Sequence, residues 1–425
     1  MQIQKPRGTY DLLPGEIELW QAFEKNVCRH FHVAHYTEIR TPIFEHTELF
    51  VRGVGETTDI VEKEMYNFVD RGNRSLTLRP EGTAGVVRAY VENKRYGKVD
   101  LDKLYYLGPM FRYERPQGGR TRQFYQYGCE VLGSNAPELD AEVVQLSYRI
   151  LADFGLQHLQ VELNSVGCSV CRPLHRDEML ALVLPRQEEF CSDCQRRMEK
   201  NPLRMFDCKH ENCQRLLTEL QVPSIAERLC AECAEHFTTV QEHLTAMSVP
   251  YQLNGKLVRG LDYYTRTAWE VTTEGSSTLA GGGRYNGLIK ELGGPDIPGI
   301  GFAGGMERVI QLAVEQQVYV PVSDSIDVYV AVADASASLP ATELVADLRA
   351  EGIATERDFN GKSLKSQLKT ADRLHAQWVL LLGEQEVAKG VVGMKSLASG
   401  EQMDVPADKV VATIINSLKK ERASQ

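Results

Sequence analysis

The chain has 425 residues, of which 43% are hydrophobic and 25% are charged, and its formal net charge at pH 7 is −10. This length is too great for one hydrophobic core, so we expect two or three domains, and the composition excludes a disordered or fibrous protein. The negative balance excludes a general attraction to nucleic acid, so any phosphate contact has to come from local basic patches.

The first residues, MQIQKPRGTYDLLPG, lack the apolar stretch of a secretory signal. Later apolar runs such as WVLLL at 378–382 are far too short to span a bilayer. We therefore expect a cytoplasmic protein with no membrane partner.

The segment LTLRPEGTAGVVRAYVE places Glu81 and Thr83 just ahead of a helix with periodic apolar residues. The simplest interpretation is an acidic residue that complements the dipole at the helix start. Glu81 and Thr83 remain candidate ligand-binding residues, because further polar clusters follow in the chain.

Two aromatic-rich segments, KLYYLGPMFRY and RQFYQYGCEVLG, flank a break at 116–119 and are predicted to pair as antiparallel strands. Alternation places Gln126, Gly128 and Glu130 on one face of the second strand, where Arg112 from the first strand can converge with them. A guanidinium at a strand end suits bidentate binding of phosphate, so the hairpin predicts a hollow for a ligand that carries both charges. A solvated hairpin with surface arginines is the alternative.

Eight of the ten cysteines form four pairs with the spacing of metal-binding turns. These pairs are Cys168 with Cys171, Cys191 with Cys194, Cys208 with Cys213, and Cys230 with Cys233. The spacing predicts two structural zinc sites of four thiolates each, with neighbouring pairs combined in sequence or with the pairs interleaved. Free or redox-active thiols without a metal are the alternative interpretation.

The segment LVRGLDYYTRTAWEV groups Arg259 with Tyr263 and Tyr264 at a strand-like edge, where tyrosines are equally often core residues. Two glycine runs follow, AGGGRYNGL with Arg284 and GIGFAGGMERVI with Arg308. Such glycines allow a backbone to approach a nucleotide closely.

A P-loop, the usual competitor for phosphate binding, is excluded. Its Gly-Lys-Ser tail occurs at 361–363, but Glu356 stands where its leading glycine belongs. On the helix predicted over 362–375, Lys365 and Lys369 lie on one face, which is either solvated or in contact with RNA.

The distribution of these patterns predicts four segments. Residues 1–164 and 249–319 carry similar strand, helix and polar motifs, so we expect them to be two parts of one domain. The cysteine-rich residues 165–248 are predicted to be a helical insertion between them. Residues 326–425 alternate strands and helices, which predicts a compact, mostly parallel α/β domain.

Five motifs in this order, RPEGT, FRYERPQGGRTRQF, LVRGLDYY, AGGGRY and GFAGGMERV, closely resemble those of bacterial histidyl-tRNA synthetases, which belong to class II of the aminoacyl-tRNA synthetases. The resemblance covers nearly the whole chain. It implies an α+β catalytic domain on a mixed, mostly antiparallel six-stranded sheet, interrupted by the cysteine-rich insertion and followed by an α/β anticodon-binding domain. The stretch 38–55 looks like the first class II motif, whose family role is a homodimer interface.

The resemblance also implies a reaction: histidine and ATP form histidyl-adenylate and pyrophosphate, and histidine is then transferred to the 3′ end of tRNA(His). Catalysis is then chiefly positioning and charge stabilisation, with Mg²⁺ helping on the pyrophosphate. By resemblance, Arg112 and Arg259 are the catalytic residues and bind the α-phosphate, whereas Arg120 and Arg308 hold the γ-phosphate end of ATP.

The histidine pocket follows from the same resemblance. The residues that bind the α-amino end of histidine are Glu81, Thr83 and Gln126. Those that take the two imidazole nitrogens are Glu130 and Tyr264, with Tyr263 and Tyr285 as walls. Arg115 and Gln117 on the hairpin turn are expected to reach the acceptor end of the tRNA.

Two alternatives remain at this point. A synthetase-like regulatory subunit of ATP phosphoribosyltransferase senses histidine without charging tRNA, but it lacks the anticodon domain and tends to lose the ATP-binding arginines. A synthetase for another amino acid would need a pocket other than Glu130 with LVRGLDYY. The density of cysteines departs from the family, of which eight paired cysteines are not a general feature.

Overall fold

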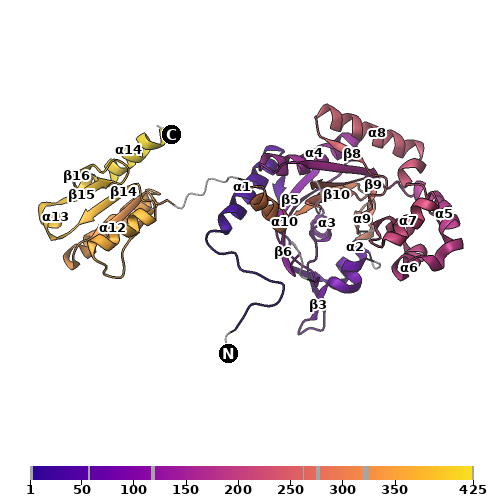
Figure 1. Cartoon of the computed structure of the whole chain (residues 1–425), viewed down its shortest axis with the longest axis horizontal. Helices are drawn as coiled ribbons and strands as arrows, with labels where there is room; N and C mark the ends of the chain where they lie inside the picture. The colour runs from indigo at the N-terminus through magenta and orange to yellow at the C-terminus, as the bar shows by residue number, and fades with distance from the viewer. Residues whose placement is uncertain are drawn as a thin grey trace. The chain divides into compact units, whose positions relative to one another are not determined.

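The chain divides into two compact units, Met1–Val320 and Pro321–Gln425, which are treated separately below (Figure 1). Within the part of the chain that the structure describes, every helix is too short or too polar to cross a membrane. The structure is a computed structural model that describes residues 3–55, 58–115, 120–261, 263–273, 278–318 and 325–423.

The first unit is built on an eight-stranded sheet, in which a long antiparallel core carries one parallel strand at each edge. The antiparallel core confirms the predicted mixed sheet, and the two short edge strands are additions to the expected six. In spatial order the strands are β1 (Thr37–Glu38), β5 (Asp102–Phe111), β6 (Gln123–Leu132), β11 (Gly299–Gly305), β10 (Ala280–Arg284), β9 (Thr265–Thr273), β7 (Leu159–Ser165) and β8 (Tyr251–Leu253).

Helices cover one face of this sheet and form the main core. Phe23, Val27 and Phe31 recur every four residues on one side of the first helix, and they pack on Tyr127 and Cys129 of β6. The opposite face of β6, with Gln126 and Glu130, is left for a cavity. The covering helices are α1 (Ile17–Val33), α4 (Pro137–Asp153), α8 (Ala231–Ala246) and α10 (Met306–Glu315).

The predicted arginine hairpin is present as the β5–β6 pair. Its register sets Gly108 opposite Gln126 and Met110 opposite Phe124, so the small and polar residues share one face as alternation requires. Arg112 continues from the end of β5, and its backbone N–H donates to the carbonyl of Arg122. The turn at 116–119, which includes Gln117, lies outside the described residues.

Smaller elements surround the cavity side. A three-stranded antiparallel sheet has the order β2, β4, β3 and lies next to the stretch 38–55. The elements are β2 (Phe44–His46), α2 (Thr47–Val54), the π-helix η1 (Ile60–Glu64), β3 (Tyr66–Val69), β4 (Ser75–Leu78), α3 (Thr83–Glu92), η2 (Arg95–Gly97) and α9 (Leu288–Glu291).

The cysteine-rich segment leaves the main sheet at the end of β7 and returns through α8 into β8, which pairs parallel with β7. Between these points it forms a helical module with its own small core, and Figure 1 shows α5, α6 and α7 grouped together. The helices are α5 (Cys171–Val183), η3 (Leu184–Glu189), α6 (Ser192–Lys200), η4 (Pro202–Asp207), α7 (Glu211–Glu219) and η5 (Ile225–Arg228).

A buried ion pair joins α4 to the sheet. Arg284 and Asp140 are both fully buried, and the guanidinium Nε donates to Asp140 Oδ1 at 3.0 Å. His236 of α8 places Nε2 3.6 Å from the same carboxylate. Because a buried charge is tolerated only with a partner, Arg284 has a structural role here, although its place at the end of a glycine run suggested a ligand-binding residue.

The second unit has a five-stranded sheet of order β13-β12-β14-β15-β16, with the first three strands parallel and the last two antiparallel. This arrangement confirms the predicted α/β domain. The elements are β12 (Val328–Val332), η6 (Ala335–Ala337), α11 (Ser338–Ala350), β13 (Thr355–Arg357), α12 (Leu364–Arg373), β14 (Trp378–Leu382), α13 (Glu384–Lys389), β15 (Val391–Ser396), β16 (Gln402–Pro406), η7 (Ala407–Lys409) and α14 (Val410–Ala423).

Candidate functional site

The first unit contains a cavity of about 680 Å³ on the face of the sheet that the main core leaves open. Residues from the β5–β6 hairpin, the start of α3, the segment before β9, and the glycine strands β10 and β11 line it. The lining includes all the residues expected to bind ATP or histidine: Glu81, Thr83, Arg112, Arg120, Gln126, Glu130, Arg259, Tyr263, Tyr264, Tyr285 and Arg308.

Glycines beneath the cavity make room for the longer side chains. A Cβ on Gly281 would lie 2.5 Å from Nη1 of Arg259, which is closer than real Cβ atoms approach their neighbours. A Cβ on Gly301 would overlap the carboxylate of Glu130. The glycines of these runs therefore make room for side chains of the protein itself, a role that the sequence pattern did not indicate.

Glu130 lies at the closed end of the cavity and is only 1% exposed. Its carboxylate accepts hydrogen bonds from the hydroxyls of Thr83 at 2.7 Å and Tyr285 at 2.5 Å, and Tyr106 places its hydroxyl at 3.4 Å. Burial raises the pKa of Glu130 to about 8, although the hydrogen bonds from Tyr285 and Thr83 lower it. Glu130 is therefore a carboxyl group that gains or loses its proton near neutral pH.

Tyr106 was missed from the sequence, although strand alternation could have found it. It lies two residues before Gly108 on the same face of β5, and the residue opposite it on β6 is Gly128. A Cβ on Gly128 would lie 2.7 Å from the Tyr106 hydroxyl. The glycine thus leaves room for the Tyr106 ring.

Glu81 lies at the other side of the closed end. It is 5% exposed, and its carboxylate accepts hydrogen bonds from the backbone N–H groups of Thr83 at 2.6 Å and Ala84 at 2.9 Å. Burial raises its pKa, and these two hydrogen bonds oppose the rise. Glu81 therefore complements the start of α3, as the simplest interpretation had it, and also faces the cavity.

Three tyrosines form a wall beside Glu130. The ring centroids of Tyr263 and Tyr264 are 4.7 Å apart, and the ring of Tyr285 meets that of Tyr263 edge-on at 5.6 Å. Burial raises the pKa of all three phenols. They are neutral at physiological pH, so they present hydroxyl groups rather than charge.

Two of the predicted arginines share a carboxylate that the sequence analysis missed. Arg120 donates to Glu114 Oε2 at 3.1 Å, and Nη1 of Arg112 lies 3.9 Å from Glu114 Oε1. Nε of Arg112 also donates to the carbonyl of Pro80 at 2.8 Å, which fixes its guanidinium beside the start of α3. Glu114 stands inside the arginine motif itself.

The other two arginines approach from the segment before β9 and from α10. Arg259 forms an ion pair with Glu270, whose second oxygen accepts a hydrogen bond from Thr278. Arg308 donates to the carbonyl of Thr278 at 2.8 Å. Burial and the nearby Arg120 lower the pKa of Arg308, so a bound anion would stabilise its charge. Four guanidinium groups therefore line the end of the cavity that can hold phosphates.

The cysteine-rich module forms a further wall that no motif predicted. Arg197, Arg204 and Lys209 line the cavity from α6 and the turn after it. Nη2 of Arg204 lies 3.6 Å from Asp59. The module thus adds charged side chains of both signs to the cavity wall, since Asp193 and Asp207 line it too, and it contacts the segment that follows the 38–55 stretch.

Comparison with known protein families identifies the family of this chain. The model of the family described as histidyl-tRNA synthetase matches residues 8–309. The chain belongs to the histidyl-tRNA synthetase family. A second model, described as an anticodon binding domain, matches residues 321–417.

Relatives in the histidyl-tRNA synthetase family are similar over nearly their whole length. The chain is 51% identical to a histidine–tRNA ligase of Desulforamulus reducens, over 97% of this chain and 99% of the relative. It is 51% identical to histidine–tRNA ligase 2 of Bacillus cereus, over 98% of this chain and 100% of the relative. The crystal structure of apo histidyl-tRNA synthetase from S. aureus superposes with a TM-score of 0.82 at 38% identity, over 97% of this chain and 100% of that one. These similarities confirm the class II fold predicted from the motifs.

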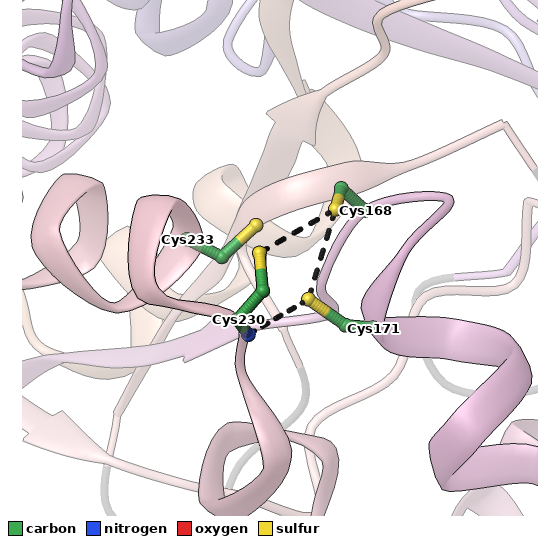
Figure 2. A group of neighbouring side chains, drawn as sticks. All are labelled: Cys168, Cys171, Cys230 and Cys233. Carbon is green, nitrogen blue, oxygen red and sulfur yellow. Dashed lines mark hydrogen bonds between the residues drawn. The ribbon is translucent and has the colours of Figure 1, made fainter.

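The eight cysteines of the insertion form two groups, each with four sulfur atoms within 4.8 Å of one another. The outer centre consists of Cys168, Cys171, Cys230 and Cys233 (Figure 2). The inner centre consists of Cys191, Cys194, Cys208 and Cys213. The first cysteine pair therefore combines with the last, and the second pair combines with the third, so the pairs are nested. Both predicted arrangements, neighbouring pairs combined in sequence and interleaved pairs, were wrong.

The path of the chain explains this nesting. The module leaves the sheet through β7 and returns through α8, and these two points are adjacent because β7 pairs with β8. The first and last cysteine pairs therefore meet at the root of the module, and the two middle pairs meet within it. Such a return is a feature of the tertiary structure, and the spacing of the pairs along the sequence does not predict it.

The sulfur geometry fits a tetrahedral metal ion. Cys168 Sγ lies 3.7 Å from Cys171 Sγ and 3.9 Å from Cys230 Sγ, and Cys191 Sγ lies 3.7 Å from Cys208 Sγ. Zinc bonds to sulfur of about 2.3 Å imply sulfur separations of about 3.8 Å in a tetrahedron. Both centres can therefore hold a metal ion.

Backbone hydrogen bonds reach two sulfur atoms of the outer centre and favour the thiolate form of Cys168, whereas burial raises the pKa of Cys171. The N–H of Val170 donates to Cys168 Sγ at 3.3 Å, and that of Cys230 donates to Cys171 Sγ at 3.2 Å. Burial raises the pKa of Cys168, but hydrogen bonds from the backbone at Cys171 and Val170 outweigh it and bring the pKa to about 7.

The raised pKa of Glu130 makes a prediction about stability. An acid whose pKa rises on folding holds its proton more tightly in the folded chain, so its contribution to stability is fully present below pH 4.5 and is lost as the pH rises to about 8. We expect the free energy of unfolding of the wild type to fall by up to about 1.4 kcal/mol per pH unit in this window, relative to Glu130→Gln. Urea denaturation of both proteins from pH 5 to pH 9 measures this difference. A difference that is constant with pH would contradict the assignment.

Proposed function

We propose that this chain is a histidine–tRNA ligase, which activates histidine with ATP and then transfers it to the 3′ end of tRNA(His). One observation carries the proposal. In a member of the histidyl-tRNA synthetase family, a single cavity joins a buried carboxyl group and tyrosines at one end to four arginines at the other. The first end suits an imidazole, and the second suits a polyphosphate.

In the activation step, a carboxylate oxygen of histidine forms a bond to the α-phosphorus of ATP, and the bond to the β-phosphate breaks to release pyrophosphate. Both reactants are anions and repel each other until cations neutralise them. Arg112 and Arg259 neutralise the α-phosphate and the carboxylate as they approach, so they act by charge and position. Arg120 and Arg308 hold the γ-phosphate end.

Mg²⁺ is the second cation that ATP brings to the reaction. It prefers oxygen ligands from phosphates, carboxylates and water. Glu114 and Glu270 lie among the arginines, so they are the carboxylates in reach of such an ion. When bound, Mg²⁺ would supply charge neutralisation on the departing pyrophosphate.

Selection of histidine rests on Glu130 and Tyr264, which take the two imidazole nitrogens. Glu81, Thr83 and Gln126 bind the α-amino end, and Tyr263 and Tyr285 enclose the ring. A side chain without both nitrogens would leave buried polar groups unpaired, which is costly in free energy. Discrimination is therefore strong without an editing site.

In the transfer step, a hydroxyl of the terminal ribose of the tRNA attacks the carbonyl carbon of the adenylate, and AMP leaves. Arg115, which is exposed at the end of the hairpin, and Gln117 reach the acceptor end. The second unit binds the anticodon. The presence of this unit and of all four cavity arginines disfavours the regulatory subunit of ATP phosphoribosyltransferase.

We assign the catalytic domain to residues 1–164 and 249–319, the insertion to 165–248 and the anticodon-binding domain to 326–425. A cytoplasmic location follows from the reaction, since ATP and tRNA are consumed there during translation.

We also propose a homodimer through the stretch 38–55 and the neighbouring small sheet. Phe44 is 52% exposed, Phe68 41% and Val69 65%, which is unusual for large apolar side chains so close together. Burial of these side chains against a second copy would remove them from water. Sedimentation equilibrium of the purified protein is expected to give the mass of two chains, and the mass of one chain would overturn this assignment.

The activation reaction is tested by pyrophosphate exchange. With ATP, Mg²⁺ and each amino acid in turn, we expect exchange of labelled pyrophosphate into ATP with histidine alone. Glu130→Ala removes the carboxyl group that holds the imidazole, and we expect exchange to fall at least about 100-fold, as for loss of a charged hydrogen bond in a buried site.

Two variants serve as controls for this exchange. Glu343→Ala removes an exposed carboxylate of α11 and should leave exchange unchanged. Arg115→Ala should retain exchange but lose about tenfold in the charging of tRNA(His), because it acts only after the adenylate forms. Exchange with another amino acid, or none with histidine despite binding, would overturn the ligase assignment.

We propose zinc as the metal of both cysteine centres, because four thiolates in a tetrahedron are typical of structural zinc. Elemental analysis of protein purified without chelators is expected to give about two zinc ions per chain. Cys213→Ser, which removes one ligand of the inner centre, should reduce this number to about one. Zinc-free protein with unchanged thermal stability would exclude a structural metal.

A further inference from the structure

An arginine next to the outer centre reaches the wall of the histidine pocket. Arg172 follows Cys171 directly, and its Nη2 donates to the carbonyl of Tyr264 at 2.6 Å. Its Nε donates to the carbonyl of Val166 at 3.0 Å. One guanidinium group thus joins the root of the cysteine module to the backbone of a pocket residue.

A second connection lies two residues further along the chain, at Arg266 of β9. The N–H of Val166 donates to the carbonyl of Arg266 at 2.7 Å, and the N–H of Arg266 donates to the carbonyl of Gly167 at 2.8 Å. The side chain of Arg266 forms an ion pair with Glu232, which lies between the last two cysteines of the outer centre. Both halves of the outer centre are therefore bonded to the segment that follows Tyr264.

The backbone of this segment is held in an unfavourable conformation. Arg266 has a φ of 54°, a left-handed value that costs an L-residue on the order of 1 kcal/mol. Such a conformation persists only where neighbouring bonds enforce it. Arg266 lies in the bulge where the pairing of β9 with β10 shifts register, and its N–H and side chain are also bonded to Gly167 and Glu232, so the sheet and the module's root both hold this backbone.

The ring of Tyr264 has little freedom to compensate for a backbone shift. It is 6% exposed and packs against Val166, and a Cβ on Gly283 beneath it would lie 2.6 Å from its Cδ1. The position of its hydroxyl is therefore set by the position of its backbone.

A metal ion would fix this arrangement. The outer centre brings together two cysteine turns that are 59 residues apart, between Cys171 and Cys230. Without a metal, four adjacent thiol groups make only weak hydrogen bonds, and any thiolates among them repel each other. With a metal, the two turns become one rigid body that carries both Arg172 and Glu232.

We propose that the outer centre, when it holds a metal ion, positions Tyr264 through Arg172, so that metal binding there raises the affinity of the cavity for histidine. Arg172 is then a positioning residue for amino-acid recognition. The proposal rests on the assignment of the cavity as a histidine site and deepens it, since the insertion takes part in selecting the amino acid.

The inner centre offers an internal comparison, because it contacts a different wall. Beside it, Lys200 lies 3.8 Å from Glu62 and Arg204 lies 3.6 Å from Asp59. Loss of its metal should therefore disturb the arginine end of the cavity rather than the histidine end.

The first experiment separates the two substrates kinetically. Arg172→Ala removes the hydrogen bonds to the carbonyls of Tyr264 and Val166 and keeps all eight cysteines. In pyrophosphate exchange we expect the KM for histidine to rise about tenfold, because a charged hydrogen bond to the pocket backbone is lost, while the KM for ATP stays within about twofold. Zinc content should remain at the wild-type value.

Arg228→Ala is the matched control. This arginine lies two residues before Cys230 in the same module, and its pair with Glu178 is exposed. Both KM values should match those of the wild type. An equal rise of both KM values in Arg172→Ala would indicate general damage to the fold and would contradict a positioning role.

The second experiment uses the wild-type protein and needs no catalysis. If the outer metal favours histidine binding, histidine must favour retention of that metal by the same factor. We expect saturating histidine, without ATP, to raise about tenfold the chelator concentration that removes one of the two zinc ions, and to leave the other unchanged. In Arg172→Ala this protection should be lost.

The outcomes distinguish this inference from the proposed function. If exchange occurs with histidine but its KM is unchanged in Arg172→Ala, or if histidine protects neither zinc ion, the coupling is refuted and the ligase assignment stands. If the outer centre of the wild type holds no metal, the coupling is likewise refuted. If the protein shows no exchange with histidine, the ligase assignment itself is refuted.

Discussion

Side chains from separate segments converge on the central strands β10 and β11, and they can lie there only because those strands carry glycine beneath them. Protein interiors are close-packed, so room above a sheet has to be made by omitting atoms. Gly281 makes it for the guanidinium of Arg259, and Gly301 makes it for the carboxylate of Glu130. Glycine is a poor strand residue, and the apolar partners on the opposite face, such as Phe302, offset that weakness.

The electrostatics of the cavity follow from this crowding. Four guanidinium groups cannot share one buried region without anions, since each raises the free energy of the others. In the chain alone, Glu114 and Glu270 offset part of this charge by pairing with Arg112, Arg120 and Arg259. Under the proposed function, a polyphosphate competes with these carboxylates for the same guanidinium groups. A divalent cation then compensates the negative charge of the carboxylates that the polyphosphate displaces. The carboxylates are therefore part of how the cavity accepts ATP, although no separate motif in the sequence marks them.

Local periodicity predicted much of the fold. Alternation along β6 separated Gln126 and Glu130 from the core residues between them, and the strand and helix pattern after residue 325 matched the second unit nearly element by element. Resemblance then drew together eleven residues that line one cavity. The failures concern contacts that depend on where a distant segment returns. The nested cysteine pairs and the module's place in the cavity wall both require the exit and return of the insertion at β7 and β8, which no local pattern encodes.

The insertion has a small hydrophobic core for a helical module of its size, because it contains few large apolar residues. Its core relies on cysteine and methionine, with Phe190 and Phe206 among few aromatic residues. Small modules of this kind usually depend on metal ions or disulfides, which reduce the freedom of the unfolded chain. If its cross-links served only its own fold, the outer centre could lie anywhere in the module. It lies instead at the root, where Arg172 donates to the carbonyl of Tyr264 and Glu232 pairs with Arg266 of β9. Its location therefore favours a role in the pocket over one confined to the insertion.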